Sequence, residues 1–475
     1  MLFPTPTFAV FFLVVLTVSW TLMPRQPLWR PFVLAASYVF YAWWDWRFVF
    51  LLAASTVVNH LAAVAISRAG PLRLRKGFLT AAIAFDLGLL AYFKYAGFLV
   101  SSADTALTSV GLSGVSGVVH AALPVGISFY TFMAISYVVD VYRRELEPAA
   151  FAPFAVYLSF FPHLVAGPIV RGRELLPQLA GPRDPRRVDT TRAYWLILSG
   201  LFLKVVIANH LATNIVDDVF AAPNRHSSLE VLMGVYGYAV QIFADFCGYT
   251  NIAIGVALLL GFEFPQNFAS PYTAVSLQDF WRRWHMTLSR WLRDYLYIPL
   301  GGNRKGRLLT YRNLLLTMLL GGLWHGAAWT FVAWGGIHGL GLAVERLRRD
   351  RRHARGRPDP PDTLWRRAFG RVVTFHVVCF AWIFFRADSF GRAGEVLTRL
   401  FDAWGQPSPL VTGSIVLAIV IGVGSQYVPA RAFAAALTGF RRLSLAGQAA
   451  CLGVGLMLID TLGPTGIAPF IYFRF

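Results

Sequence analysis

The sequence predicts an all-α protein that crosses a membrane several times. Of its 475 residues, 56% are hydrophobic and only 14% are charged, and the mean hydropathy is +0.54. Soluble domains carry about 25% charged residues, so this balance places the chain among membrane proteins. The apolar residues form long segments separated by short polar ones, which is the pattern of a polytopic helical protein.

Ten apolar segments are expected to be spans, at about 7–23, 32–50, 49–66, 78–100, 121–141, 193–213, 231–260, 371–385, 411–428 and 447–461. The first lacks a basic n-region and an A-x-A site, so we expect it to be retained, with no soluble domain attached. Basic residues mark alternate breaks, whereas the connection 101–120 has no Lys or Arg and is expected outside the cell. Within the spans, Asp86, Lys94 and Asp140 are expected to pair with each other or to line a water-filled cavity.

The distribution of positive charge favours contact with membrane lipid over nucleic-acid binding. The formal net charge is +19, but the arginines cluster in short segments between spans, as in cytoplasmic loops that face anionic lipid. We therefore expect membrane lipid as a partner and no nucleic acid. The three cysteines, Cys247, Cys379 and Cys451, lie in apolar segments without CxxC spacing, so neither a disulfide nor a metal site is expected.

The segment 160–179, FFPHLVAGPIVRGRELLPQL, interrupts the helical pattern. Pro162, Gly167 and Pro168 predict a re-entrant loop that enters and leaves on the cytoplasmic side. Irregular backbone at that depth needs protein or a cavity to satisfy its polar groups. His163 is expected to be structural.

The segment 276–306 predicts an amphipathic helix lying in the cytoplasmic interface. Ser276 and Asp279 form a capping-box pattern, apolar residues recur at spacings of three and four, and arginines occupy the other face. His285 falls at the edge of the apolar face. The arginines either anchor lipid headgroups or receive the phosphates of an anionic donor.

Between Arg312 and Glu345, the only ionisable side chains are those of His325 and His338. A straight helix of this length would measure about 50 Å, so the chain must tilt, kink or fold back, and its glycines provide places to do so. His325 would lie about 20 Å into the membrane. The residues alone support a hydrogen-bonded core histidine and a functional histidine equally.

Six strings together resemble the membrane-bound O-acyltransferases, in the bacterial branch with the alginate O-acetyltransferase membrane subunit and the teichoic-acid D-alanyl transfer protein. They are FFPHLVAGP at 160–168, DFCGYTNIAIG at 245–255, FPQNFASPY at 264–272, DFWRRWHMTLSRWLRDYLYIPLGGNRKG at 279–306, GGLWHGAAWTFVAWGGIHG at 321–339 and the terminal FIYFRF. The resemblance implies one membrane domain, 1–475, with about eleven or more transmembrane and re-entrant helices around a central tunnel. Its expected parts are peripheral spans at 1–120, a catalytic core at 121–345, a basic cytoplasmic loop at 346–370 and C-terminal spans at 371–475.

The same resemblance implies that His325 is the catalytic histidine and His285 the second motif histidine. Acyl transfer from a thioester to a hydroxyl needs a proton acceptor, and a neutral imidazole suits this role. We expect His325 to act as general base, with His285 or nearby amide and indole donors stabilising the oxyanion. Further candidates for the tunnel or donor site are Trp324, Trp281, Arg282, Arg283, Ser289, Asp245 and Asn251.

A covalent intermediate is less favoured, because no G-x-S-x-G elbow is present and Cys247 has no basic partner nearby in sequence. No bound cofactor is expected. The co-substrate is expected to be acyl-CoA, above all acetyl-CoA, or an acyl carrier protein, and the acceptor an extracytoplasmic polysaccharide. A secreted acetyltransferase partner and a bacterial inner-membrane location are also expected.

Three alternatives remain open at this stage. The enzyme could transfer D-alanine from a carrier protein. The protein could instead be a transporter or acyl conduit that feeds a secreted transferase, because broken helices and the polar stripe of Gln241, Asp245 and Asn251 also fit a transporter. A structural scaffold predicts that both histidines are replaceable without effect.

Overall fold

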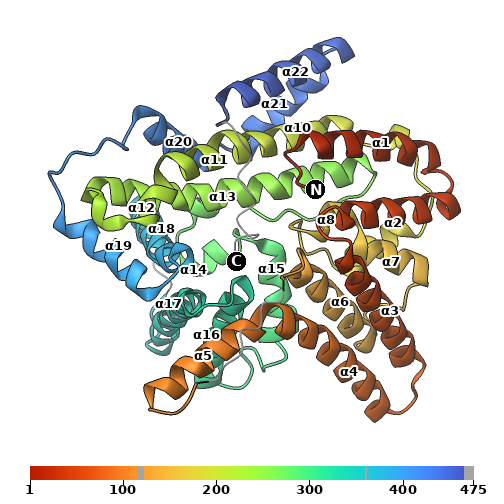
Figure 1. The fold of residues 1–475 in the computed structure, drawn as a ribbon, viewed down its shortest axis with the longest axis horizontal. Coiled ribbons are helices and arrows are strands. Elements are labelled where there is room, and N and C mark those ends of the chain that lie inside the picture. Colours follow the sequence, from red (N-terminus) through yellow and green to blue (C-terminus); the bar gives the residue numbers. More distant parts are fainter. Residues whose placement is uncertain (115–121, 359–360, 465–475) are drawn as a thin grey trace. The chain divides into compact units, whose positions relative to one another are not determined.

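The computed structural model describes residues 1–114, 122–358 and 361–464, and every regular element in those residues is a helix (Figure 1). The all-α prediction is confirmed. By length and composition, six of the described helices can cross a membrane, and a bent pair gives a seventh. The count of eleven or more helices stays a prediction, and the terminal FIYFRF string lies outside the described residues. Contacts divide the chain into two compact units, residues 1–190 with 256–265, and residues 191–255 with 266–475.

The first unit begins with paired apolar helices. Their bounds are α1 Pro6–Leu22, α2 Gln26–Ala42, α3 Arg47–Arg68, α4 Leu72–Leu90, α5 Ala96–Ser109 and α6 Ile127–Tyr142. α4 and α5 join through a π-helical turn into one helix of 38 residues. The buried carboxylate of Asp86 accepts hydrogen bonds from Asn59 at 3.0 Å and Ser55 at 3.3 Å, so its partners lie on α3, and not among the charged residues expected to pair with it.

The helix is interrupted in the segment 160–179 of the first unit, as its prolines predict. This part of the chain contains α7 Phe151–Ser159, the single turn α8 Phe161–Leu164 and α9 Gly172–Leu179, with non-helical backbone between α8 and α9. All residues from 154 to 172 are buried, so protein surrounds this irregular backbone. A ring nitrogen of His163 lies 2.9 Å from the carbonyl oxygen of Tyr157. The re-entrant path through a membrane stays a prediction.

The second unit contains two long, adjacent helices. The first runs from Thr190 to Ala221 as α10 Thr190–Leu201, α11 Asn209–Leu211 and α12 Asp217–Ala221, joined by π-helical turns, and the second is α13 Ser228–Leu259. The Nζ atom of Lys204 lies 2.7 Å from the carboxylate of Asp245, and both side chains are buried. The polar stripe on α13 therefore faces protein at Asp245, as its cost in lipid requires.

The histidine-bearing segment folds back on itself. α16 Arg307–His325 and α17 Trp329–Ala354 form an antiparallel hairpin that turns at residues 326–328. A Cβ on Gly322 would overlap the carbonyl oxygen of Phe331, and one on Gly335 would overlap that of Met318, so only glycine allows this close backbone contact. The rest of the unit comprises α18 Leu364–Arg386, α19 Phe390–Asp402, α20 Gly413–Gly424, α21 Ala430–Arg441 and α22 Leu445–Leu462.

Candidate active site

The segment that carries His285 is not the single amphipathic helix that its periodicity predicts. It forms two short helices, α14 Leu277–Trp281 and α15 Met286–Leu292, followed by a π-helical turn at Arg293–Tyr297. The predicted start is confirmed, because the Ser276 hydroxyl accepts a hydrogen bond from the Asp279 amide at 3.1 Å. The helix is interrupted because backbone groups near its middle bond to residues 267–269.

His285 occupies the interruption with φ 40° and ψ 56°, which is the left-handed region. That conformation costs a non-glycine residue about 1–2 kcal/mol. Such strain persists only where the surroundings impose it, and it clusters at functional sites. The backbone at His285 therefore makes this residue a functional candidate for a reason that sequence periodicity could not reveal.

The two predicted catalytic histidines lie together in the interior. The ring centroids of His285 and His325 are 6.3 Å apart, and the two residues are 0% and 2% exposed. The hairpin contributes His325 as the last residue of α16, and its ring is 5.0 Å from both Trp324 and Trp334. Phe246 packs edge-on against His285 at 4.6 Å. The pair is thus enclosed by aromatic rings.

Buried polar atoms at this site lack protein partners. Neither ring nitrogen of His285 makes a hydrogen bond with the described residues, and the same holds for the indole Nε1 of Trp334. Unpaired buried polar groups are costly, so these atoms are candidates for hydrogen bonds to a substrate. Burial also lowers the pKa of His285 from its ordinary value, which keeps this ring neutral.

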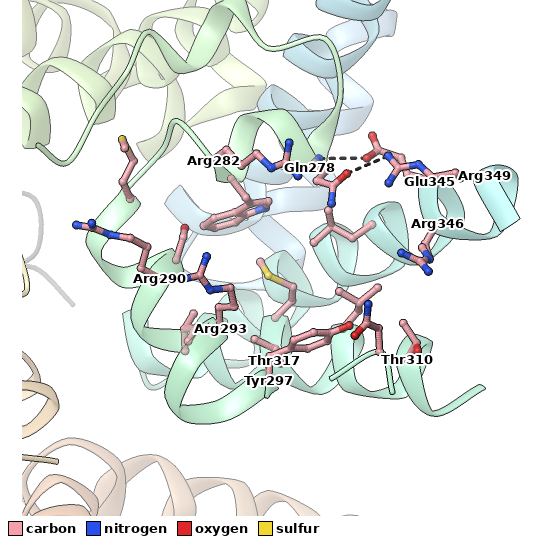
Figure 2. A pocket seen from close by; sticks show the side chains of 18 residues that line it. Gln278, Arg282, Arg290, Arg293, Tyr297, Thr310, Thr317, Glu345, Arg346 and Arg349 are labelled. Carbon is pink, nitrogen blue, oxygen red and sulfur yellow. Dashed lines mark hydrogen bonds between the residues drawn. The ribbon is translucent and has the colours of Figure 1, made fainter. Parts of the chain in front are cut away.

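A pocket of about 550 Å³ opens beside this aromatic enclosure. Figure 2 shows arginine side chains from α15, α17 and the segment after α14 around it. Arg282, Arg290, Arg293, Arg346 and Arg349 line it, together with apolar side chains and the predicted residues Trp281 and Ser289.

Trp281 connects the pocket with the histidines. Its ring is 5.7 Å from that of Trp334, and its Nε1 donates to Nδ1 of His338 at 3.3 Å. Trp334 in turn contacts both His325 and His338 at 5.0 Å. One wall of the pocket is therefore continuous with the aromatic enclosure of the histidine pair.

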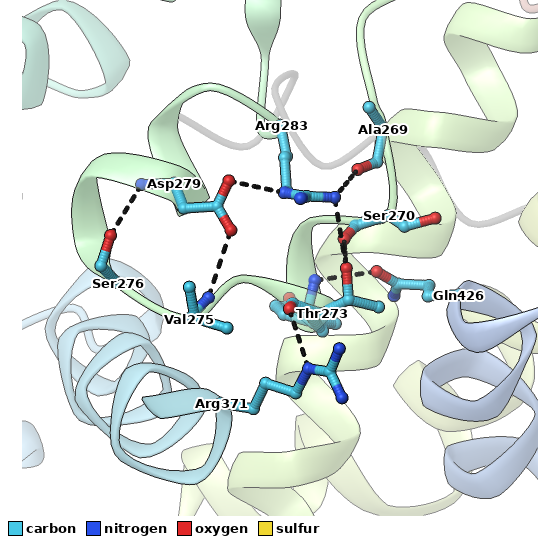
Figure 3. A network of polar contacts seen from close by, with 10 residues as sticks. Ala269, Ser270, Thr273, Val275, Ser276, Asp279, Arg283, Arg371 and Gln426 are labelled. Carbon is cyan, nitrogen blue, oxygen red and sulfur yellow. Dashed lines mark hydrogen bonds and ion pairs between the residues drawn. The ribbon is translucent and has the colours of Figure 1, made fainter. Parts of the chain in front are cut away.

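Four sequence candidates do not line the pocket, and one of them, Trp324, packs against His325 instead. Arg283 donates to the Asp279 carboxylate at 2.8 Å and to the carbonyl oxygen of Ala269 at 3.4 Å, within a network that holds the loop before α14 (Figure 3). Asp245 is paired with Lys204, and Asn251 is half-buried on α13. Their side chains do not line the pocket, because α13 and the Arg283 network form the supporting structure.

Sequence reasoning missed several residues of the site. Trp334 faces His325 only because the hairpin returns along α16, and Phe246 and Phe385 reach the histidines from other helices. Lys204, which pairs with Asp245 in the supporting structure and not in the site, could have been found, since it is the only Lys or Arg in the apolar segment 193–213. Among the described residues, no group of three or more His, Cys, Asp or Glu side chains could hold one metal ion.

Known proteins share this sequence over much of its length. Residues 119–355 match the family model described as MBOAT, the membrane-bound O-acyltransferase family. The chain is 44% identical over 377 residues to the "Probable alginate O-acetylase" of Azotobacter vinelandii, which covers 78% of this chain and 72% of that protein. It is 36% identical over 428 residues to the peptidoglycan O-acetyltransferase of Helicobacter pylori, with 84% and 79% covered.

A more distant relative is the teichoic acid D-alanyltransferase of Bacillus subtilis, 28% identical over 285 residues, with 56% of this chain and 69% of that protein covered. The apolar helices, the level of identity and the family match agree with one another. This chain belongs to the membrane-bound O-acyltransferase family and is a multi-pass membrane enzyme that transfers acyl groups to oxygen.

Proposed function

We propose that this enzyme transfers an acetyl group from cytoplasmic acetyl-CoA to a hydroxyl group of an extracytoplasmic polysaccharide, directly or through a secreted partner, in a bacterial inner membrane. The observation that carries the proposal is the buried His285–His325 pair beside an arginine-lined pocket. Relatives named for acetylation of alginate and of peptidoglycan support the acetyl group and the polysaccharide acceptor.

The pocket fits the chemistry of the donor. Coenzyme A carries several phosphate groups, and arginine guanidinium groups bind phosphate through paired, charge-assisted hydrogen bonds. A volume of about 550 Å³ lies within the ordinary range for small-molecule sites, which is about 300–1,000 Å³. Arg282 makes no side-chain hydrogen bond or ion pair with the described residues, so its guanidinium group is available to a ligand.

The pocket also includes residues near the C-terminal end of α17. Arg346 and Arg349 of the pocket lie in the basic segment 346–370, which is not a loop throughout, because α17 continues through it to Ala354. Basic segments between spans mark cytoplasmic loops. A cytoplasmic donor would therefore enter the enzyme by this pocket, with its thioester directed past Trp281 toward the histidines.

The transfer step uses the two histidines in different roles. Neutral His325 takes the proton of the acceptor hydroxyl while the hydroxyl oxygen forms a bond to the acetyl carbonyl carbon. The carbonyl oxygen becomes an oxyanion, which a ring N–H of His285 and the indole N–H of Trp334 stabilise. The carbon–sulfur bond then breaks, the thiolate of CoA leaves, and the proton held by His325 passes to it.

D-alanyl transfer is the second candidate, because a relative named teichoic acid D-alanyltransferase shares the sequence. The same histidine chemistry would serve a D-alanyl thioester. The two candidates differ in the donor, which would be a carrier protein in place of free CoA. An acyl conduit without catalysis is the remaining alternative, and it does not need the histidines.

The test is single-turnover transfer of radiolabelled acetyl from acetyl-CoA by the purified protein in nanodiscs. We expect His325→Ala to lower the rate about 10²- to 10⁴-fold, the usual contribution of a general base. His285→Ala should lower it about 10²-fold or more, as loss of an oxyanion donor does. His163→Ala is the matched control, since His163 is equally buried but bonds to the carbonyl oxygen of Tyr157.

Each outcome separates the candidates. If the wild type transfers D-alanine from a carrier protein and transfers no acetyl from acetyl-CoA, the D-alanyl function replaces the acetyl function. If folded His325→Ala protein transfers acetyl at the wild-type rate, the catalytic proposal is wrong. The acyl-conduit hypothesis then remains. Loss of activity only in the two site variants, with His163→Ala near wild type, supports general-base catalysis by His325.

A further inference from the structure

Asn267 connects a loop to both sides of His285. Its backbone carbonyl oxygen accepts a hydrogen bond from the Met286 amide at 2.9 Å. Its side-chain Oδ1 accepts from the Thr287 amide at 3.2 Å and from the Thr287 hydroxyl at 2.9 Å. On the other side, the Ala269 amide donates to the carbonyl oxygen of Arg283 at 2.9 Å. We call residues 267–269 the clamp segment.

These bonds replace the bonds of a continuous helix. In an α-helix, the Thr287 amide would donate to the carbonyl oxygen of Arg283, four residues earlier. Here that carbonyl oxygen accepts from Ala269, and the Thr287 amide donates to Asn267. The clamp segment therefore takes up both partners of one helical bond, the one that would span His285.

The amphipathic pattern through this segment favours one uninterrupted helix, so local sequence does not cause the break. His285 adopts φ 40° between the two anchored points. In that conformation its ring lies 6.3 Å from the ring of His325. A continuous helix would give His285 an ordinary helical backbone and direct its side chain elsewhere.

We propose that Asn267 is a positioning residue, which holds the backbone at residues 283–287 so that the left-handed His285 presents its ring to His325. Asparagine suits this role because its carbonyl oxygen has two lone pairs and accepts both Thr287 bonds. Its side chain is 1% exposed, and its Nδ2 has no partner among the described residues. This proposal rests on the proposed function of His285.

The loop that carries Asn267 is itself held in place. The Arg283 side chain bonds to Ala269, and the Arg371 side chain donates to the carbonyl oxygen of Thr273 at 3.3 Å (Figure 3). The Tyr272 amide donates to the side-chain oxygen of Gln426 at 2.9 Å. α18 and the segment after α20 therefore anchor the loop, which makes it a rigid support for the strained residue.

The experiment compares Asn267→Ala with Asn209→Ala in nanodiscs. Asn209 is an equally buried asparagine, 1% exposed, on α11 and outside the site. We expect Asn267→Ala to lower kcat about 10- to 100-fold with KM for acetyl-CoA unchanged, since small displacements of catalytic groups have effects of that size. Asn209→Ala should keep the wild-type kcat even if its melting temperature falls.

A double variant distinguishes positioning from general loosening. If Asn267 acts through His285, the Asn267→Ala/His285→Ala protein has the same kcat as His285→Ala alone. Thr287→Val removes one of the two bonds to Oδ1 and keeps the side-chain shape. Thr287→Val should lower kcat about two- to tenfold. It is the variant to use for the test if Asn267→Ala does not fold.

Cryo-electron microscopy of the Asn267→Ala protein supplies a readout that does not depend on activity. We expect residue 285 to leave the left-handed region. Wild-type kcat in folded Asn267→Ala, or an unchanged backbone at His285, overturns the proposal while the catalytic roles stand. If the wild type transfers no acetyl, the proposed function fails, and the backbone of the variant still decides the role of Asn267.

Discussion

At the scale of residues, neighbours in sequence have different tasks. Arg282 lines the pocket, whereas Arg283 binds Asp279 and Ala269 in the supporting network. Both are charged and both follow α14 in a basic stretch, but Arg283 stands four residues after Asp279, which is the spacing of an ion pair on a helix.

This contrast yields a prediction about donor binding. Arg282→Ala should raise KM for acetyl-CoA about tenfold or more with kcat little changed, because one charged hydrogen bond contributes about 1.5–3 kcal/mol. Steady-state kinetics at two salt concentrations measures the effect, which salt should weaken. Arg283→Ala is the control, with an expected loss of melting temperature and an unchanged KM. Equal KM values for the two variants would remove Arg282 from the donor site.

At the scale of elements, the α16–α17 hairpin brings Trp334 to His325. Its tight packing depends on glycines that meet backbone atoms of the facing helix. Gly335 lies against Met318, while a Cβ on the adjacent Gly336 would meet only Leu319, at an ordinary contact distance of 3.6 Å. Neighbouring glycines of one helix are therefore unequal in their tolerance of a methyl group.

We accordingly expect Gly335→Ala to destabilise the protein by about 1–3 kcal/mol, the usual cost of overpacking. It should also lower kcat, because separating the helices moves Trp334 away from His325. Thermal unfolding in detergent and transfer kinetics check both effects. Gly336→Ala should change neither, and a similar loss in both variants would show that helix flexibility, and not close packing, requires the glycines.

At the scale of the whole molecule, basic segments assign the sides of the membrane. The pocket arginines of α17 lie in such a segment, whereas residues 101–120 carry no Lys or Arg. The connection expected at 101–120 is shorter in the structure, because residues 101–109 belong to α5. Its residues 115–120 lie outside the described residues. Orientation follows from this bias in Lys and Arg.

Cysteine labelling tests the orientation. After Cys451→Ser removes the exposed thiol, Cys247 and Cys379 remain buried. An impermeant maleimide should label Leu112→Cys in intact spheroplasts, and Arg355→Cys only after lysis. The reversed pattern would place the arginine-lined pocket outside the cell and contradict a cytoplasmic donor.

The sequence by itself determined the helical membrane class and the family, because hydropathy and the motif strings are properties of local residue order. It also singled out as catalytic candidates the two histidines whose rings the structure places 6.3 Å apart. It also predicted that the stretch from Arg312 to Glu345 tilts, kinks or folds back at its glycines, and the structure shows that it folds back at residues 326–328. Only the tertiary structure decided the break at His285, since the bonds that cause it come from Asn267 and Ala269 in another segment. Likewise, Trp334, Phe246 and the Lys204–Asp245 pair became visible only when packed helices brought together residues that are distant along the chain.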